Sequence, residues 1–249
     1  MSLLSINPQP SHPHSHTIIF LHGRGSTPRR LADSLTHLAP SSSGRSLPSS
    51  LPSVRWVFPA PPGAGPDTAL FQWFAPYHER IQAQGLRDSV HLLRRILDEE
   101  AALLDGRYHR VVLVGFSQGA ATAAHVLLHL ATSLGGLVGF SGRMVFPGRG
   151  LADTRRVLRE ATDDAEEDNG DDEDDEAVRQ TPVLLEHCAD DHLVPVESGR
   201  VLRDTLRGFG AQVTWCEYPD GGHWLNAPDG VDDAIRFLVD VVGIQQAVE

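Results

Sequence analysis

Cysteine, long apolar runs and positive charge are all scarce in this chain of 249 residues. The two cysteines, Cys188 and Cys216, are too few for a disulfide scaffold, and both fall in or beside expected strands, where buried free thiols are ordinary. No run of about 18 apolar residues is available to cross a bilayer. Residues 1–16 are polar and lack the apolar core of a signal peptide. We therefore expect a soluble, cytoplasmic protein without a transmembrane segment.

Acidic residues outnumber basic ones by 33 to 21, which gives a formal net charge of −12. An acidic chain is poorly suited to bind nucleic acid, so we expect no nucleic-acid partner. Much of the excess lies in residues 163–176, which hold 11 carboxylates and no basic side chain. The remainder of the chain is nearly neutral. Because residues 161–177 show no apolar period, we expect a disordered surface insertion there.

Short apolar runs alternate with amphipathic stretches along most of the chain. We expect buried strands at residues 17–21, 54–58, 111–114, 136–141, 182–187 and 213–218. We expect helices at 28–38 and 197–208, over a long stretch with apolar residues spaced by three or four from Leu86 to Leu104, and near the C-terminal end. This alternation predicts an α/β fold with a mostly parallel sheet and helices on both faces. The length suits a single domain.

Two other segments complete the expected organisation. Residues 1–16 are expected to be a flexible leader ahead of a domain at 17–249. The alternating His12, His14 and His16 are consistent with a transition-metal site or with incidental histidines, and the second interpretation is favoured. The Ser/Pro/Gly-rich stretch near 40–53 is expected to be a mobile surface insertion. No metal and no cofactor are expected.

One serine lies where a buried strand meets a helix of small residues. The sequence Gly-Phe-Ser-Gln-Gly at 115–119 fits the pattern G-x-S-x-G, directly after the strand at 111–114. In such a turn the strained serine presents its hydroxyl beyond the edge of the sheet, and the glycines avoid crowding with the neighbouring backbone. The motif predicts that Ser117 is a nucleophile, in preference to a structural turn serine.

A serine nucleophile needs a base, and that base needs a carboxylate to orient it and stabilise its charged form. In α/β-hydrolases these residues follow the serine in the order Asp or Glu, then His. His223 follows the last expected strand and is preceded by two glycines, so it is favoured as the base over His187 and His192. Asp190 and Asp191 are adjacent after the strand at 182–187, and we expect one of them to reach the imidazole.

Two further loops are expected at the same edge of the sheet. The sequence His-Gly-Arg-Gly at 22–25 follows the first strand, where α/β-hydrolases place an oxyanion-hole amide. The amides of Arg24 and Gln118 are therefore the candidate oxyanion donors. Trp73 and Phe74 come after the strand at 54–58. They are expected to line an apolar substrate pocket, with packing in the core as the alternative.

Taken in order, these motifs resemble the phospholipase/carboxylesterase family, which includes the acyl-protein thioesterases. The resemblance spans about residues 17–242 and rests on segments 21–25, 73–74, 84–86, 115–119 and 191–195 and on His223. It implies that Asp191 is the triad acid, because the family's acid comes immediately before a segment like His-Leu-Val-Pro at 192–195. It also implies that Arg24 and Gln118 supply the oxyanion amides. The chain departs from the family's usual pattern at Arg24 and at Ala75.

The resemblance implies an α/β-hydrolase fold and a metal-independent serine hydrolase of the carboxylesterase or acyl-protein thioesterase type. Such an enzyme cleaves acyl esters or thioesters through an acyl-enzyme, and an S-acylated protein is one such substrate. One alternative is a small serine hydrolase that acts on short-chain or secondary-metabolite esters. Another is a non-catalytic, ligand-binding relative in which the acidic insertion acts as an interaction tail.

Overall fold

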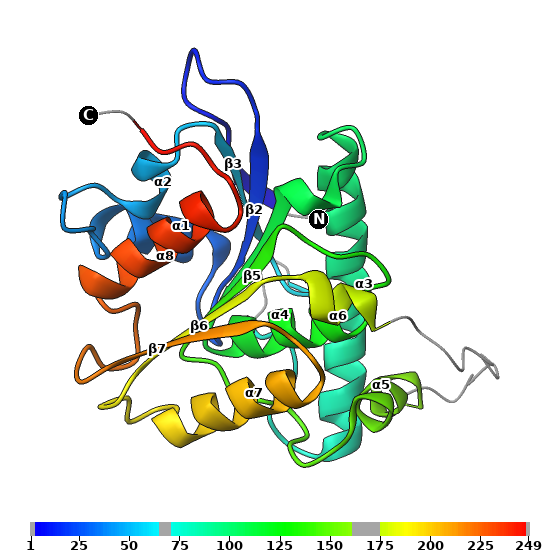
Figure 1. Ribbon diagram of the computed structural model, residues 1–249. Coiled ribbons are helices and arrows are strands. Elements are labelled where there is room, and N and C mark those ends of the chain that lie inside the picture. Colours follow the sequence, from blue (N-terminus) through cyan, green and yellow to red (C-terminus); the bar gives the residue numbers. More distant parts are fainter. Residues whose placement is uncertain (1–2, 65–70, 161–174, 248–249) are drawn as a thin grey trace.

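In a computed structural model, the chain forms a seven-stranded sheet with helices packed on both faces (Figure 1). The structure describes residues 3–64, 71–160 and 175–247. The strands are β1 (Leu3–Ile6), β2 (His16–Leu21), β3 (Val54–Pro59), β4 (Val111–Phe116), β5 (Gly136–Phe140), β6 (Val183–Cys188) and β7 (Val213–Tyr218). The helices are α1 (Pro28–His37), α2 (Leu47–Ser50), α3 (Glu79–Ala102), α4 (Gln118–Leu128), α5 (Leu151–Arg159), α6 (Glu176–Gln180), α7 (Val196–Gly208) and α8 (Asp229–Asp240), with a short 3-10 helix, η1 (Tyr108–Arg110).

The strand order β1-β3-β2-β4-β5-β6-β7 places β4 at the centre of the sheet. Neighbouring strands pair in parallel, except that β1 is antiparallel to β3. Parallel strands all end at one edge, so the loops that follow β2, β4, β5, β6 and β7 meet there. The predicted α/β fold with a mostly parallel sheet is confirmed, and it forms one domain.

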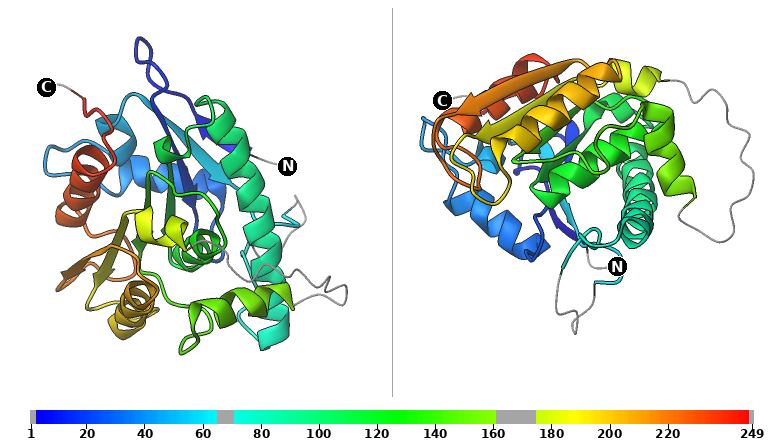
Figure 2. Two further views of the ribbon diagram at one scale, coloured as in Figure 1. Left: turned by 45° about the vertical axis from the view of Figure 1, so that its right-hand side comes forward. Right: turned by 90° about the horizontal axis from the view of Figure 1, so that it is seen from below.

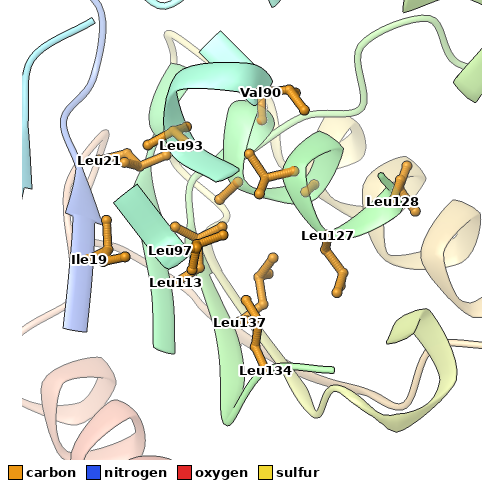
Figure 3. Close-up of a cluster of buried hydrophobic side chains, with 14 of the residues drawn as sticks. Ile19, Leu21, Val90, Leu93, Leu97, Leu113, Leu127, Leu128, Leu134 and Leu137 are labelled. Atoms are coloured by element: carbon orange, nitrogen blue, oxygen red, sulfur yellow. The ribbon is translucent and has the colours of Figure 1, made fainter. Parts of the chain in front are cut away.

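Each face of the sheet has its own apolar core. On one face, Leu93 and Leu97 of α3 lie near Ile19, Leu21 and Leu113 of the sheet, and α4 and α7 complete this layer (Figure 3). The helix α5 lies beside α3 (Figure 2). On the other face the core is covered by α1, α2 and α8. Burial on both faces explains why the central strands β2, β4 and β5 are largely continuous apolar runs in the sequence. Within the described ranges, no helix is long and apolar enough to cross a membrane.

The prediction of a flexible leader at residues 1–16 differs from the structure. Leu3–Ile6 forms β1, which pairs with β3 along its whole length. Without β1, the strand β3 would expose a row of unpaired backbone groups at the edge of the sheet, and the N-terminal segment satisfies them. The backbone amide of Ser15 also donates to the carbonyl of Ser53 at 3.0 Å. With only four residues, three of them apolar and most of them exposed, β1 is too short to show a strand period in the sequence.

The two predicted insertions have different outcomes. The segment near 40–53 is packed rather than mobile, because it contains α2 and buries Leu47 and Leu51 against the core. Ser46 caps α2 by accepting a hydrogen bond from the Ser49 amide at 3.3 Å. Of the acidic insertion at 161–177, residues 161–174 lie outside the described residues. The helix α6 begins at Glu176, inside the predicted insertion.

A buried carboxylate in β6 should make stability depend on pH. Glu186 is 3% exposed, and its pKa is held well above 4.5 by burial and then by the charge of Asp233. The folded protein therefore binds this proton more tightly than the unfolded chain does. The stability contributed by the group is fully present below the unfolded pKa and is lost as the pH rises through the folded pKa.

Glu186→Gln removes this loss, because the amide cannot ionise. We expect the variant to raise the melting temperature clearly at about pH 8 and only slightly at about pH 4, where wild-type Glu186 is protonated in the folded protein and mostly protonated in the unfolded chain. Thermal unfolding of both proteins at the two pH values measures the effect. An equal change at both pH values would contradict the assignment.

Candidate active site

Ser117 lies between β4 and α4 in a strained turn. Its φ is 55° and its ψ is −118°, a conformation that costs a residue with a side chain about 1–3 kcal/mol. The Ser117 amide donates to the carbonyl of Phe140 at 2.8 Å, which fixes the turn to the neighbouring strand β5. A Cβ at Gly115 would collide with the backbone of Gly119, and a Cβ at Gly119 would collide with the carbonyl of Leu21. Both glycines are therefore required by close backbone contacts, as the motif predicts.

Three side chains from separate loops form one hydrogen-bonded chain at this turn. His223 Nε2 lies 2.9 Å from Ser117 Oγ, and His223 Nδ1 lies 2.7 Å from Asp191 Oδ2. A carboxylate can only accept, so Nδ1 carries the imidazole proton and Nε2 can accept the proton of the serine hydroxyl. The structure thus brings together the residues that the sequence indicates as nucleophile, base and acid.

Asp191 is held as a buried, ionised carboxylate. Its side chain is 0% exposed, and its Oδ1 accepts hydrogen bonds from the amides of Leu193 and Val194, each at 2.9 Å. Burial alone would raise the pKa of Asp191, but the hydrogen bonds from His223 and from the two amides outweigh burial and lower it below the ordinary value. At neutral pH the carboxylate is therefore charged and can stabilise a protonated imidazole.

The adjacent Asp190 has a different contact. Its Oδ1 accepts a hydrogen bond from the amide of Gly222 at 2.8 Å, one residue before His223. Gly221 and Gly222 have φ values of 129° and 64°, which favour glycine and let the chain turn back after β7. The two aspartates diverge, as the sequence analysis expects. Asp190 fastens the loop that carries the histidine, whereas Asp191 contacts the imidazole.

The other two candidate histidines do not take the place of His223. His187 Nε2 lies 2.8 Å from the carbonyl of Val194 and 3.4 Å from Asp191 Oδ2. A bond to a carbonyl requires the proton on Nε2, so His187 donates to Val194. Burial also lowers the pKa of His187, which keeps it neutral in this position. His192 is exposed on the surface of the same loop.

The loop between β2 and α1 lies against the serine. A Cβ at Gly23 would be 3.0 Å from the Phe116 ring and 3.3 Å from Ser117 Cβ, so the backbone passes close to the nucleophile. The amides of Arg24 and Gln118 donate no hydrogen bond to another described residue. Two such amides beside a serine hydroxyl can donate hydrogen bonds to an oxyanion and stabilise its negative charge. These are the two predicted donors.

Trp73 and Phe74, predicted to line the substrate pocket, are buried in the core instead. They are 1% and 2% exposed, and within the described residues neither lines the cleft over Ser117. The side chain of Gln118 binds this segment, accepting from the Trp73 amide at 2.9 Å and donating to the Phe74 carbonyl at 2.8 Å. Trp73 Nε1 donates to the carbonyl of His22 at 2.8 Å. The aromatic pair therefore supports both loops that carry the candidate oxyanion amides.

Trp73→Ala should consequently reduce stability without changing acyl-chain preference. The variant loses a buried ring and its hydrogen bond, and we expect a loss of about 3–5 kcal/mol in the free energy of unfolding. Because no contact with the acyl chain is removed, kcat/KM should fall by a similar factor for acetyl and for longer acyl esters. Trp73→Phe, which keeps an aromatic ring, should be intermediate. Denaturant unfolding and an ester series test this, and a loss that grows with chain length would contradict the core position.

A cleft of about 360 Å³ opens over the serine. It is lined by residues from the loops at the edge of the sheet, namely Gly23, Arg24, Ser26, Pro76, Phe116, Ser117, Gln118, Arg143, Leu193, Val194 and His223. Leu193 is an exposed apolar side chain at its rim. Arg143 belongs to no motif and escapes prediction, although its position just after the strand at 136–141 indicates this edge of the sheet.

Metal-binding groups are not clustered in the described part of the chain. No set of three or more His, Cys, Asp or Glu side chains there is arranged to hold a metal ion. Two of the three N-terminal histidines bond nearby hydroxyls, with His14 Nε2 2.9 Å from Thr17 Oγ1 and His16 Nδ1 3.1 Å from Ser15 Oγ.

The sequence is similar to known hydrolases. The family model described as phospholipase/carboxylesterase matches residues 6–150. The chain is 28% identical to acyl-protein thioesterase 1 of Gibberella zeae over 240 residues, which cover 90% of each protein. It is 31% identical over 228 residues to a probable inactive carboxylesterase of Oryza sativa subsp. japonica, covering 86% of this chain and 80% of that protein.

The fold is also similar to solved structures. Acyl-protein thioesterase 2 of Zea mays superposes with a TM-score of 0.69 at 23% sequence identity, over 97% of this chain and 99% of that one. The structure of esterase PE8 gives a TM-score of 0.60 at 25% identity, over 96% of this chain and 97% of that one. These neighbours show an α/β-hydrolase fold. The family model covers more than half of the sequence, and the chain belongs to the phospholipase/carboxylesterase family.

Proposed function

We propose that this protein is a serine hydrolase that cleaves acyl esters or thioesters through an acyl-enzyme. Ser117 is the nucleophile, His223 the general base and acid, and Asp191 the residue that orients His223. The observation that carries the proposal is the continuous hydrogen-bonded chain from Ser117 Oγ through both imidazole nitrogens to a buried carboxylate. Membership of the phospholipase/carboxylesterase family supports ester hydrolysis.

The geometry is suited to the two halves of an acyl transfer. Ser117 Oγ attacks the carbonyl carbon while His223 Nε2 takes its proton. The tetrahedral intermediate then collapses, the bond to the alcohol or thiol breaks, and His223 returns the proton to that leaving group. A water molecule, deprotonated by His223, attacks the acyl-enzyme in the same way. Release of the carboxylic acid regenerates the Ser117 hydroxyl.

The amides of Arg24 and Gln118 are assigned as the donors that stabilise the negative charge developing on the carbonyl oxygen. Both amides are free of hydrogen bonds to other described residues, and Arg24 and Gln118 line the same cleft as Ser117. Donors already aimed at the oxyanion stabilise it without reorganisation, and one such donor contributes about 3–4 kcal/mol to transition-state stabilisation in comparable sites. The Gln118 side chain and Trp73 fix the backbone on either side.

The thioesterase relatives support an acylated substrate, and an S-acylated protein is one candidate. A second candidate is a short-chain ester, favoured by the cleft volume of about 360 Å³, which is close to the lower limit of about 300 Å³ for small-molecule sites. Turnover of matched oxygen esters and thioesters from acetyl to palmitoyl separates the two. Activity that rises with chain length supports the first candidate, and activity confined to short chains supports the second.

A non-catalytic relative is the competing explanation, since one rice relative is named as inactive. In this chain the candidate nucleophile, base and acid are all present and hydrogen-bonded. Labelling by a fluorophosphonate, which reacts only with an activated serine, tests the difference. Absence of labelling together with absence of turnover would contradict the proposed hydrolase.

A further inference from the structure

Arg143 lies on the loop after β5, and the register of the sheet places this loop beside the candidate nucleophile. Phe116 and Phe140 pair at the ends of β4 and β5, so the segments beginning with Ser117 and Ser141 leave the sheet side by side. The Ser117 amide donates to the Phe140 carbonyl at 2.8 Å, which joins the two turns. Arg143, which comes two residues after Ser141, lines the cleft over Ser117.

The loop holds a fixed position. The Ser141 amide donates to the carbonyl of Glu186 at 2.9 Å. A Cβ at Gly142 would lie 2.9 Å from Ala120 Cβ and 3.2 Å from Leu202 Cδ2. The backbone is therefore packed closely between α4 and α7. A side chain that follows such a segment reaches the cleft from a rigid base, which suits recognition of a substrate group.

The guanidinium of Arg143 has no counter-ion within the described residues. It is half-buried and makes no hydrogen bond or ion pair there, and burial lowers its pKa without an opposing carboxylate. Arg149 lies in the same connection between β5 and α5, but it pairs with Glu79 at 2.6 Å. A partly buried, unpaired charge is unfavourable for the free protein. An anionic ligand would remove that cost.

The arginines that line the cleft contrast with the net charge of −12 carried by the protein. Arg24 and Arg143 line the cleft, and no Asp or Glu among the described residues does. Arg24 Nε donates to the neutral Gln72 Oε1 at 3.2 Å, so its charge is not neutralised by that contact. Guanidinium groups match the oxygens of carboxylates and phosphates, which they bind by two parallel hydrogen bonds.

We propose that the active-site cleft selects esters or thioesters that carry a carboxylate or phosphate group, and that Arg143 binds this group. The inference rests on the proposed hydrolase function and gives it a substrate class. The anion is held before and during the reaction, so its recognition should lower KM more than it raises kcat. Arg24 adds to the attraction at the entrance of the cleft.

Matched pairs of substrates test the inference. p-Nitrophenyl hemiglutarate and p-nitrophenyl pentanoate differ by a terminal carboxylate in place of a methyl group on the acyl side. In the second pair, 3-carboxyphenyl acetate and 3-carbamoylphenyl acetate, the leaving group carries either a carboxylate or a neutral amide. In the third pair, 4-acetoxyphenyl phosphate and phenyl acetate, the leaving group either carries a phosphate or lacks it. Each kcat/KM is divided by the rate of hydroxide-catalysed hydrolysis of the same ester, which removes intrinsic reactivity.

For wild type we expect one or more anionic esters to be preferred over the neutral partner by about 10- to 100-fold. Arg143→Met should reduce that ratio to about twofold or less, mainly through KM, and Arg143→Lys should keep part of it. Arg149→Met, which removes a charge from the same connection outside the cleft, should keep the wild-type ratio. The preference should also weaken at about 1 M salt.

Equal normalised kcat/KM values for charged and neutral esters in all three pairs would overturn the inference, as would a preference that Arg143→Met leaves intact. Circular dichroism shows whether Arg143→Met is folded. If it is not, Arg143→Lys and the salt dependence of wild type decide the question. Absence of turnover on every ester, neutral ones included, would instead contradict the proposed function.

Discussion

Ser117→Ala and His223→Ala are each expected to reduce kcat by about a millionfold, and the double variant should be no slower than either single variant. Serine without the base is a weak nucleophile, and the base without serine has no proton to take. The two residues therefore act as one unit, consistent with the 2.9 Å contact between His223 Nε2 and Ser117 Oγ. Single-turnover kinetics with an activated aryl ester measures the loss.

Ser141→Ala is a matched control for this experiment. Ser141 also follows a central strand and also has a positive φ, of 50°, but its Oγ has no hydrogen-bond partner among the described residues. We expect the control to retain activity within about tenfold of wild type and to unfold at a similar temperature. Losses that multiply in the Ser117→Ala/His223→Ala double variant would show that the residues act independently.

The second large effect should separate the two adjacent aspartates. Asp191→Asn is expected to lower kcat by about 10⁴-fold, because the amide presents a donor to His223 Nδ1 and favours the wrong tautomer. The amides of Leu193 and Val194 can still bond to the side-chain oxygen of the variant. The loop should therefore remain in place, and the melting temperature should change much less than the rate.

Asp190→Asn should lose less than about tenfold in kcat/KM, because the amide oxygen can still accept from Gly222. Asp190→Ala removes that acceptor and should loosen the loop that carries His223, so it should be slower than Asp190→Asn. Steady-state kinetics of the three variants settles the order. If Asp190→Asn proved slower than Asp191→Asn, the acid would have to be reassigned.

The central features of the site could be predicted because they depend on backbone geometry that the sequence encodes locally. A strained turn needs glycines on both sides of Ser117, and the apolar runs mark where the parallel strands end. Loops after those strands must meet at one edge. The family resemblance predicts Asp191 rather than Asp190 as the acid, and the contacts of the two carboxylates agree with that prediction. The residue pattern without the resemblance leaves both aspartates open.

Other features depend on long-range packing, which a sequence pattern does not contain. Trp73 and Phe74 are aromatic residues of the kind that often line a pocket, but both are buried in the core. Hydrogen bonds from Trp73 to the Gln118 side chain and to the His22 carbonyl hold them there. The strand β1 is stabilised by its backbone pairing with β3 at the edge of the sheet, a contact between distant parts of the sequence. Arg143 can be recognised as a cleft residue only from the structure, in which the register of β4 and β5 brings its loop beside Ser117.

The nucleophile can be identified directly by covalent trapping. Wild-type protein is treated with a fluorophosphonate, and the product is measured by intact-protein mass spectrometry and peptide mapping. We expect one covalent group per chain, on Ser117 Oγ, strongly slowed labelling in His223→Ala and none in Ser117→Ala. A group attached to another residue, or undiminished labelling of Ser117→Ala, would contradict Ser117 as the residue that forms the acyl-enzyme.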